Sequence, residues 1–214
     1  NVEIERTQIV PDCLWAIVIN PTSGQGKGAE IGKTVAGYFS KNDLKYQIIS
    51  GTSSENVLKD LRTFLSNNPR CSGVISVGGD GLAHLILQAV VPNKVAFAVI
   101  PAGTGNDFVR ALRWSLSEIE KQLDFVTTQE PSEIDLGLVD GEWFGAVLST
   151  GFDSTVNERA NKMRWPKGPA KYNVAIALEL PTFSPSHFTI ELDDRTIETE
   201  AVLIAVGNGS SYGG

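Results

Sequence analysis

Three glycine-bearing turns carry the residues whose types and spacing can do chemistry. They are NPTSGQGKG at residues 20–28, GGDG at 78–81 and PAGTGND at 101–107. Glycine permits tight turns, and bare backbone amides near the start of a helix favour phosphate. A carboxylate beside phosphates makes sense when a cation or a proton transfer involves it. These turns therefore predict a site for a phosphate-containing ligand, with either a cation or a proton transfer at the carboxylates.

Each turn adds a polar group of its own. Lys27 brings a point charge to the first turn, and Asp80 lies between glycines in the second. Thr104, Asn106 and Asp107 bring a hydroxyl, an amide and a second carboxylate to the third. The first turn is not a P-loop, because the Gly-x-x-x-x-Gly-Lys-Ser/Thr spacing is absent. Taken singly, a glycine turn is often only a tight connection, and Asp107 alone would most often cap a helix.

The elements around the turns predict a doubly wound α/β domain over residues 1–133. Apolar runs predict buried strands, amphipathic stretches predict helices between them, and crossovers of this length make a parallel sheet covered on both faces. The predicted strands are 14–19, 46–49, 74–77 and 95–100, and the predicted helices are 29–40, 55–65, one after GGDG and one from about 106. All three turns then share the carboxyl edge of the sheet, where such folds bind ligands.

Residues 134–214 predict an incomplete β-sandwich-like second domain. A hairpin is expected between 134–139 and 143–149 around Asp140-Gly141, and another between 187–192 and 197–206. A helical insertion is expected from about 153 to 180. The open sheet edges of such a domain are expected either to be completed by further chain or to pair in a homodimer.

Composition narrows the class of partner. The net charge of −7 and pI near 4.9 argue against nucleic acid. Two cysteines without metal-ligand spacing indicate free thiols in a reducing cytoplasm. No apolar run approaches the roughly 20 residues that span a bilayer, so membrane contact is expected from the surface.

The helical insertion is locally basic and aromatic. It holds Arg159, Lys162, Arg164, Trp165, Lys167 and Lys171. One interpretation is a docking patch for an anionic membrane, where each basic side chain near the surface contributes about 1 kcal/mol. The alternative is a solvated helix and loop.

The ordered set of motifs resembles the catalytic domain of diacylglycerol and sphingosine kinases, and within it the soluble bacterial diacylglycerol kinases, the actinobacterial branch in particular. The resemblance rests on the three turns and continues through Ile134-Asp135-Leu136-Gly137, residues 149–153 (STGFD) and Gly207-Asn208-Gly209. It covers nearly the whole chain.

The resemblance implies an ATP- and Mg²⁺-dependent lipid kinase that phosphorylates diacylglycerol to phosphatidic acid in bacterial phospholipid metabolism, in the cytoplasm and peripherally at the inner face of the membrane. Phosphoryl transfer of this kind is mainly positioning and charge stabilisation. Asp80 and Asp107 would support catalysis and hold Mg²⁺ through water. The nucleotide would be bound by Asn20, Pro21, Thr22, Ser23, Gly24, Lys27, Thr52, Gly79, Asp80, Gly81, Gly103, Thr104 and Asn106.

Two departures from the family pattern stand out. Leu82 replaces a common Thr after GGDG, and His84-Leu85 replace Asn-Glu, which leaves the role of His84 open between a structural hydrogen bond and catalysis. The segment in which the family keeps its catalytic base is expected beyond Gly214, so we expect these 214 residues not to turn over on their own. The alternatives are a related soluble kinase, such as an NAD kinase, and a nucleotide-binding module without catalysis. The identity of the lipid and the oligomeric state stay open.

Overall fold

The structure is a computed structural model that describes residues 14–103, 106–112, 118–163, 165–166 and 170–209. It divides into two compact units, one formed by residues 1–146 with 208–214 and the other by residues 147–207. Each unit is described by itself.

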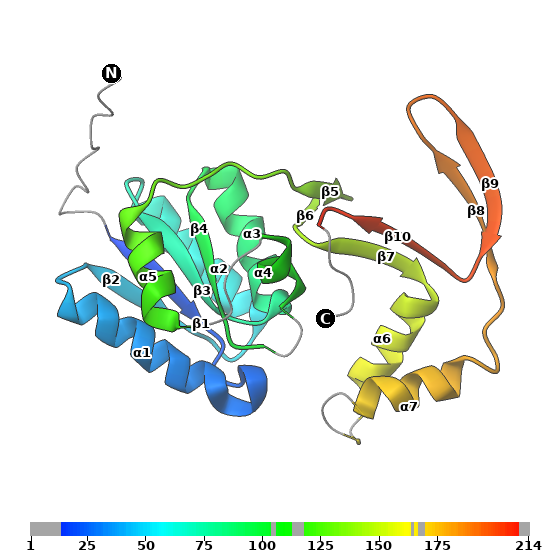
Figure 1. The fold of residues 1–214 in the computed structure, drawn as a ribbon, viewed down its shortest axis with the longest axis horizontal. Helices are drawn as coiled ribbons and strands as arrows, with labels where there is room; N and C mark the ends of the chain where they lie inside the picture. Colours follow the sequence, from blue (N-terminus) through cyan, green and yellow to red (C-terminus); the bar gives the residue numbers. More distant parts are fainter. Residues whose placement is uncertain (1–13, 104–105, 113–117, 164, 167–169, 210–214) are drawn as a thin grey trace. The chain divides into compact units, whose positions relative to one another are not determined.

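The first unit is built on a parallel sheet of four strands in the order β2-β1-β3-β4 (Figure 1). In register, Trp15 at the start of β1 lies between Tyr46 of β2 and Gly73 of β3. The strands are β1 (Trp15–Ile19), β2 (Tyr46–Ile49), β3 (Gly73–Gly78) and β4 (Phe97–Pro101). The connecting elements are η1 (Ser23–Gly26), α1 (Lys27–Lys41), α2 (Ser54–Asn67), α3 (Asp80–Asn93), α4 (Asp107–Ala111) and α5 (Ile119–Thr128).

Both faces of this sheet are buried. Successive residues of a strand point to opposite faces, so Ile17 and Ile75 pack with Phe39 of α1 and Leu123 of α5. Their strand neighbours pack with α2 and α3 on the opposite face, in a cluster that includes Ala16, Val18, Val74, Leu61 and Ile86. The predicted fold class, a covered parallel sheet followed by a β-rich segment, is confirmed.

The hairpin predicted around Asp140-Gly141 forms, although its second strand is shorter than expected. β5 (Gly137–Val139) pairs with β6 (Glu142–Phe144), and both turn residues have positive φ, as a type I′ turn requires. The prediction of one strand over 143–149 is wrong, because the chain leaves the pair at Gly145. A Cβ atom there would lie 2.1 Å from the ring of Phe108, so only glycine lets the chain pass.

The second unit combines three pieces. β7 (Val147–Gly151) pairs antiparallel with β10 (Leu203–Gly207), and β8 (Ser186–Glu191) pairs with β9 (Thr196–Ala201). The predicted helical insertion forms two helices, α6 (Phe152–Lys162) and α7 (Ala170–Glu179). They pack through Val156, Ala160 and Ala175, with Phe152 and Met163 beside them.

The single strand predicted over 197–206 is also wrong, because Val202 divides it into β9 and β10. The carbonyl oxygen of Val202 accepts a hydrogen bond of 2.8 Å from the amide of Phe152. Gly151 has a φ of 95°, and a Cβ atom at this position would lie only 2.5 Å from the carbonyl oxygen of Val202. The chain therefore turns at Val202, and β10 continues along β7 instead of along β8.

Asn208 holds the returning chain on the first unit. Its Nδ2 donates to the carbonyl oxygens of Asp135 (2.7 Å) and Gly145 (3.2 Å). Its backbone amide donates to the carbonyl oxygen of Ala146 (2.7 Å). The β5–β6 pair thus belongs to the first unit. The two units meet at residues 146–147 and 207–208 of the chain. The domain boundary predicted between residues 133 and 134 is a different division, and it stays a prediction.

Candidate phosphate-binding site

The three glycine turns lie against one another at the carboxyl edge of the sheet. A Cβ atom at Gly24 in the first turn would lie 2.1 Å from the carbonyl oxygen of Ala102, just before the third. A Cβ atom at Gly103 would lie 2.6 Å from the Cα of Gly79 in the second turn. Side chains at these positions would force the turns apart, so glycine is what allows their backbones to converge.

The first turn is fixed from both ends. The amide of Asn20 donates to the carbonyl oxygen of Val77 in β3 (3.0 Å), which ties the turn to the centre of the sheet. The Oδ1 of Asn20 accepts from both the amide (3.1 Å) and the hydroxyl (2.9 Å) of Thr22. Gly24, Gln25 and Gly26 then have positive φ, at 56°, 62° and 100°. The turn is therefore held in one shape that leads directly into α1.

Asp80 joins the second turn to the third. Its Oδ2 accepts a hydrogen bond from the amide of Asp107 (3.2 Å), and its Oδ1 accepts one from the amide of Phe108 (3.1 Å). These amides begin α4 and would otherwise lack helical partners. Each carboxylate oxygen can accept more than one bond. Asp80 can therefore hold α4 in place and still face a cation or a water molecule.

The third turn carries Asp107 and Asn106 beside that contact. The Oδ1 of Asp107 accepts from Arg110 (3.1 Å), and the Nδ2 of Asn106 donates to the carbonyl oxygen of Gly103 (3.1 Å). The Oδ1 of Asn106 is buried and has no hydrogen-bond partner among the described residues. A buried acceptor of this kind suits a ligand or a bound water. Thr104, which was predicted to bind nucleotide, lies outside the described residues.

Two other residues predicted to bind the nucleotide, Lys27 and Thr52, have fewer contacts with the three turns. Lys27 is exposed at the start of α1, next to Gly24. Thr52 is exposed after β2 at the same edge of the sheet, where the neighbouring Ser53 caps α2, but no contact between described residues joins it to the three turns. A groove of about 230 Å³ adjoins the first turn and is lined by Ile19, Pro21, Ala29, Gly32, Lys33, Ala36, Ile48 and Ser50.

Within the described residues, the polar contact of the His84 side chain is with β6 and not with the glycine turns. Its Nε2 lies 3.7 Å from Glu142 of β6; the His84 side chain is about half exposed and that of Glu142 is largely exposed. The structural interpretation of His84 is thus favoured over the catalytic one. Gln88, one helical turn further along α3, donates to the carbonyl oxygen of Trp143 (2.8 Å) and accepts from its amide (2.9 Å). This reciprocal contact was not predicted, and its only sequence signal is a Gln four residues after His84.

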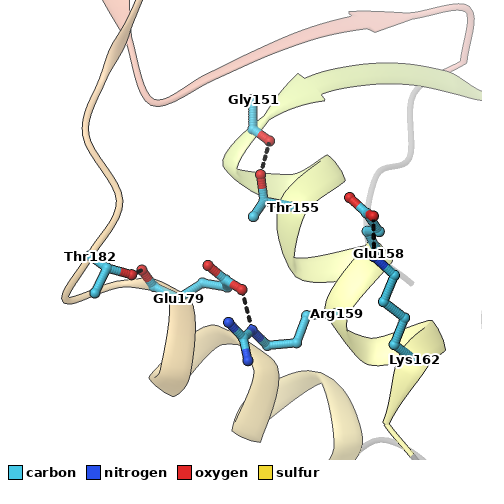
Figure 2. A network of polar contacts seen from close by, with 7 residues as sticks. All are labelled: Gly151, Thr155, Glu158, Arg159, Lys162, Glu179 and Thr182. Atoms are coloured by element: carbon cyan, nitrogen blue, oxygen red, sulfur yellow. Dashed lines mark hydrogen bonds and ion pairs between the residues drawn. The ribbon is translucent and has the colours of Figure 1, made fainter.

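The basic insertion is partly neutralised within the second unit. Figure 2 shows Arg159 paired with Glu179 of α7 and Lys162 paired with Glu158 one turn earlier in α6. The hydrogen bond from Lys162 holds the pKa of Glu158 below its usual value. Trp165 is 79% exposed and Lys171 is half-buried. Arg164 and Lys167 lie outside the described residues.

The residues that the structure describes contain no cluster of three or more His, Cys, Asp or Glu side chains that could hold a metal ion. A metal ion at the glycine turns would thus need ligands from a bound phosphate as well as from protein. None of the helices within the described ranges is long and apolar enough to cross a membrane.

A covered parallel sheet with three converging glycine turns at its carboxyl edge defines an α/β protein with a candidate phosphate site. Residues 15–139 match the family described as the diacylglycerol kinase catalytic domain, and residues 146–214 match the YegS C-terminal NAD kinase beta sandwich-like domain. The chain belongs to the diacylglycerol kinase catalytic-domain family, as the sequence resemblance predicted.

Relatives agree with this assignment, and a solved structure shares the fold. A diacylglycerol kinase of Mycobacterium tuberculosis H37Rv is 32% identical over 201 residues, which cover 91% of this chain and 64% of the relative. One of Bacillus subtilis is 31% identical over 144 residues, which cover 66% of this chain and 48% of the relative. A crystal structure of a diacylglycerol kinase from Bacillus anthracis shares the fold, with a TM-score of 0.65 at 24% identity, over 93% of this chain and 65% of that one.

Proposed function

We propose that this chain is the nucleotide-binding part of an ATP-dependent kinase that transfers the γ-phosphoryl group to the hydroxyl of diacylglycerol, giving phosphatidic acid. The carrying observation is the close approach of Gly24 to Ala102 and of Gly79 to Gly103. Because these approaches bring three amide-bearing turns together at one sheet edge, one polyphosphate can bridge all three. The names of the relatives support a lipid acceptor.

Mg²⁺ fits this proposal. The carboxylate of Asp80 accepts from the backbone amide of Asp107, which brings the two residues together, and the Oδ1 of Asn106 is a buried acceptor without a described partner. Mg²⁺ is commonly held by one or two carboxylates together with water and substrate phosphates. Bound there, it would neutralise charge on the transferring phosphoryl group. Asp80 would also align Asp107 through the amides at the start of α4.

The proposed lipid acceptor determines where we propose that the protein acts. Diacylglycerol resides in a bilayer, so the kinase would act from the cytoplasm by transient contact with an anionic membrane. The proposal includes no nucleic acid partner, because the chain carries a net charge of −7.

The test is transfer of labelled phosphate from ATP to dioctanoylglycerol in mixed micelles. The chain is assayed as given and extended at its carboxyl end to the length of its relatives. We expect lipid-dependent transfer by the extended chain that Asp80→Ala abolishes. Asp60→Ala is the matched control, because it removes an exposed carboxylate of α2.

The assay also separates the alternatives. Transfer to NAD or to a sphingoid base but not to diacylglycerol would reject the proposed acceptor, and nucleotide binding without any transfer would favour a non-catalytic module. The expectation that the 214 residues alone do not turn over stays a prediction. Equal rates for the two lengths of chain would contradict it.

A further inference from the structure

The outward face of α7 is apolar. Tyr172, Ile176 and Leu180 follow one another at intervals of one helical turn, with 48%, 40% and 60% of their surfaces exposed. Asn173 and Ala177 lie beside them on the same face and are also exposed. Residues 170–180, all of which the structure describes, thus present a face without a charged side chain. We call Tyr172, Ile176 and Leu180 the α7 ridge.

The opposite face holds α7 firmly on α6. Ala175 is fully buried against the cluster that contains Val156 and Ala160. Arg159 of α6 pairs with Glu179 at the end of α7, as Figure 2 shows. From the ridge itself, the hydroxyl of Tyr172 donates to the Oδ1 of Asn157 of α6 (3.2 Å). The ridge is therefore displayed by a packed helical pair, and its exposure does not come from a loose segment.

The surroundings of the ridge match the boundary between lipid and water. Trp165, in the connection between the two helices, is 79% exposed, and the side chain of Lys162 is 75% exposed. Trp, Tyr and Lys are the side chains that anchor proteins at the level of lipid headgroups. Residues 152–180 hold five basic and three acidic residues, whereas the chain as a whole has a net charge of −7. This segment therefore carries a net positive charge that suits an anionic surface, although the chain as a whole is acidic.

We propose that the α7 ridge, with Trp165, is the surface on which the protein rests on an anionic bilayer. Apolar contact supplies the main part of the binding, because Arg159 and Lys162 already have carboxylate partners. The inference rests on the proposed function in one respect, namely that the acceptor is a membrane lipid. A ridge of three side chains is small for a stable protein dimer, which needs about 800 Å² on each partner. It is ample for reversible insertion at an interface.

The test is sedimentation with vesicles of phosphatidylcholine containing phosphatidylglycerol, without ATP or diacylglycerol. The probe variant is Ile176→Gln with Leu180→Gln. The matched control is Leu138→Gln with Leu192→Gln, which removes two exposed leucines elsewhere, 55% and 45% exposed. We expect the ridge variant to lower vesicle partitioning roughly tenfold and the control to change it less than twofold. A blue shift of tryptophan emission on vesicles, lost in Trp165→Phe, would place Trp165 at the interface.

Two results would overturn the proposal. One is unchanged vesicle binding by the ridge variant. The other is a melting temperature lowered by several degrees, or loss of a dimer in sedimentation velocity, because the ridge would then be buried against protein. Since the assay contains no ATP, failure of kinase activity would count against the proposed function and leave this result intact.

Discussion

The carboxyl edge of the parallel sheet and the α6–α7 pair differ in what fixes their surfaces. At the sheet edge, glycines set the geometry by allowing backbones to approach, as at Gly24 and Gly103. In the α6–α7 pair, a small core holds two helices that display large side chains, as in the α7 ridge. The first surface is suited to amides that must meet a small anion in one geometry. The second is suited to apolar contact with a surface that has no fixed shape.

This difference has a consequence for mutation. A methyl group added at the sheet edge displaces backbone, whereas a side chain changed on the ridge displaces only solvent. Substitutions at the glycine turns of the sheet edge should therefore lower stability and ligand binding together, whereas substitutions on the α7 ridge should lower membrane binding without lowering stability.

The largest effect is expected from Gly24→Ala. The new Cβ atom would meet the carbonyl oxygen of Ala102, and φ is 56° at this position. We expect the free energy of unfolding to fall by about 2–4 kcal/mol and nucleotide binding to be lost. Gly37→Ala in α1 is the control, because nothing lies near its Cβ position. It should add about 0.5–1 kcal/mol in the same denaturant titration, and equal losses for both variants would contradict the account.

Asp80→Ala should come next. The amides of Asp107 and Phe108 lose their acceptor, so the free energy of unfolding should fall by about 1–3 kcal/mol. Urea titration measures this loss, with Asp60→Ala as the matched control. A loss of nucleotide binding without any loss of stability would mean that Asp80 serves the ligand alone and does not hold α4.

Tyr38→Phe tests the far side of the same unit. The Tyr38 hydroxyl donates to Asp124 (2.6 Å) and lies 3.2 Å from the hydroxyl of Thr127. Its removal should cost about 1 kcal/mol near neutral pH and leave nucleotide binding unchanged. A parallel loss of nucleotide binding would show that the two ends of the unit are coupled.

The same hydroxyl gives a dependence on pH. Burial, reinforced by the bond to Asp124, raises the pKa of Tyr38 above its ordinary value of 10.0. Because the neutral hydroxyl is the favoured form, its contribution is fully present below pH 10 and is lost as the pH rises through the raised value. The difference in stability between wild type and Tyr38→Phe should shrink in that range. A constant difference would contradict this reasoning.

The smallest effect is expected from Arg159→Met in the second unit. The ion pair with Glu179 is partly exposed, so its loss should cost about 0.5 kcal/mol and less at high salt. Thermal melting at two salt concentrations measures both. A loss of stability as large as that expected for Gly24→Ala would contradict the proposed difference between the sheet edge and the α6–α7 pair.

The sequence predicted the first unit well for a physical reason. Apolar runs at β1, β3 and β4 are buried on both faces, and the turns follow them directly, so strand order and a shared edge were enough to bring Gly24, Gly79 and Gly103 together. The contact from Asp80 to the amides of α4 could not be predicted, because it depends on how far α4 lies from the second turn. The strand breaks at Gly145 and Val202 were also not predicted, because each depends on a residue distant in the sequence. The break at Gly145 depends on Phe108, and the break at Val202 depends on Gly151.

Hydrogen exchange with and without Mg²⁺ and a non-hydrolysable ATP analogue tests the central claim most directly. If the three turns form one site, peptides covering residues 20–28, 78–81 and 101–107 should gain protection together over one range of nucleotide concentration, while α7 stays unchanged. Protection confined to one turn, or appearing at separate concentrations, would show that the turns do not bind a common ligand.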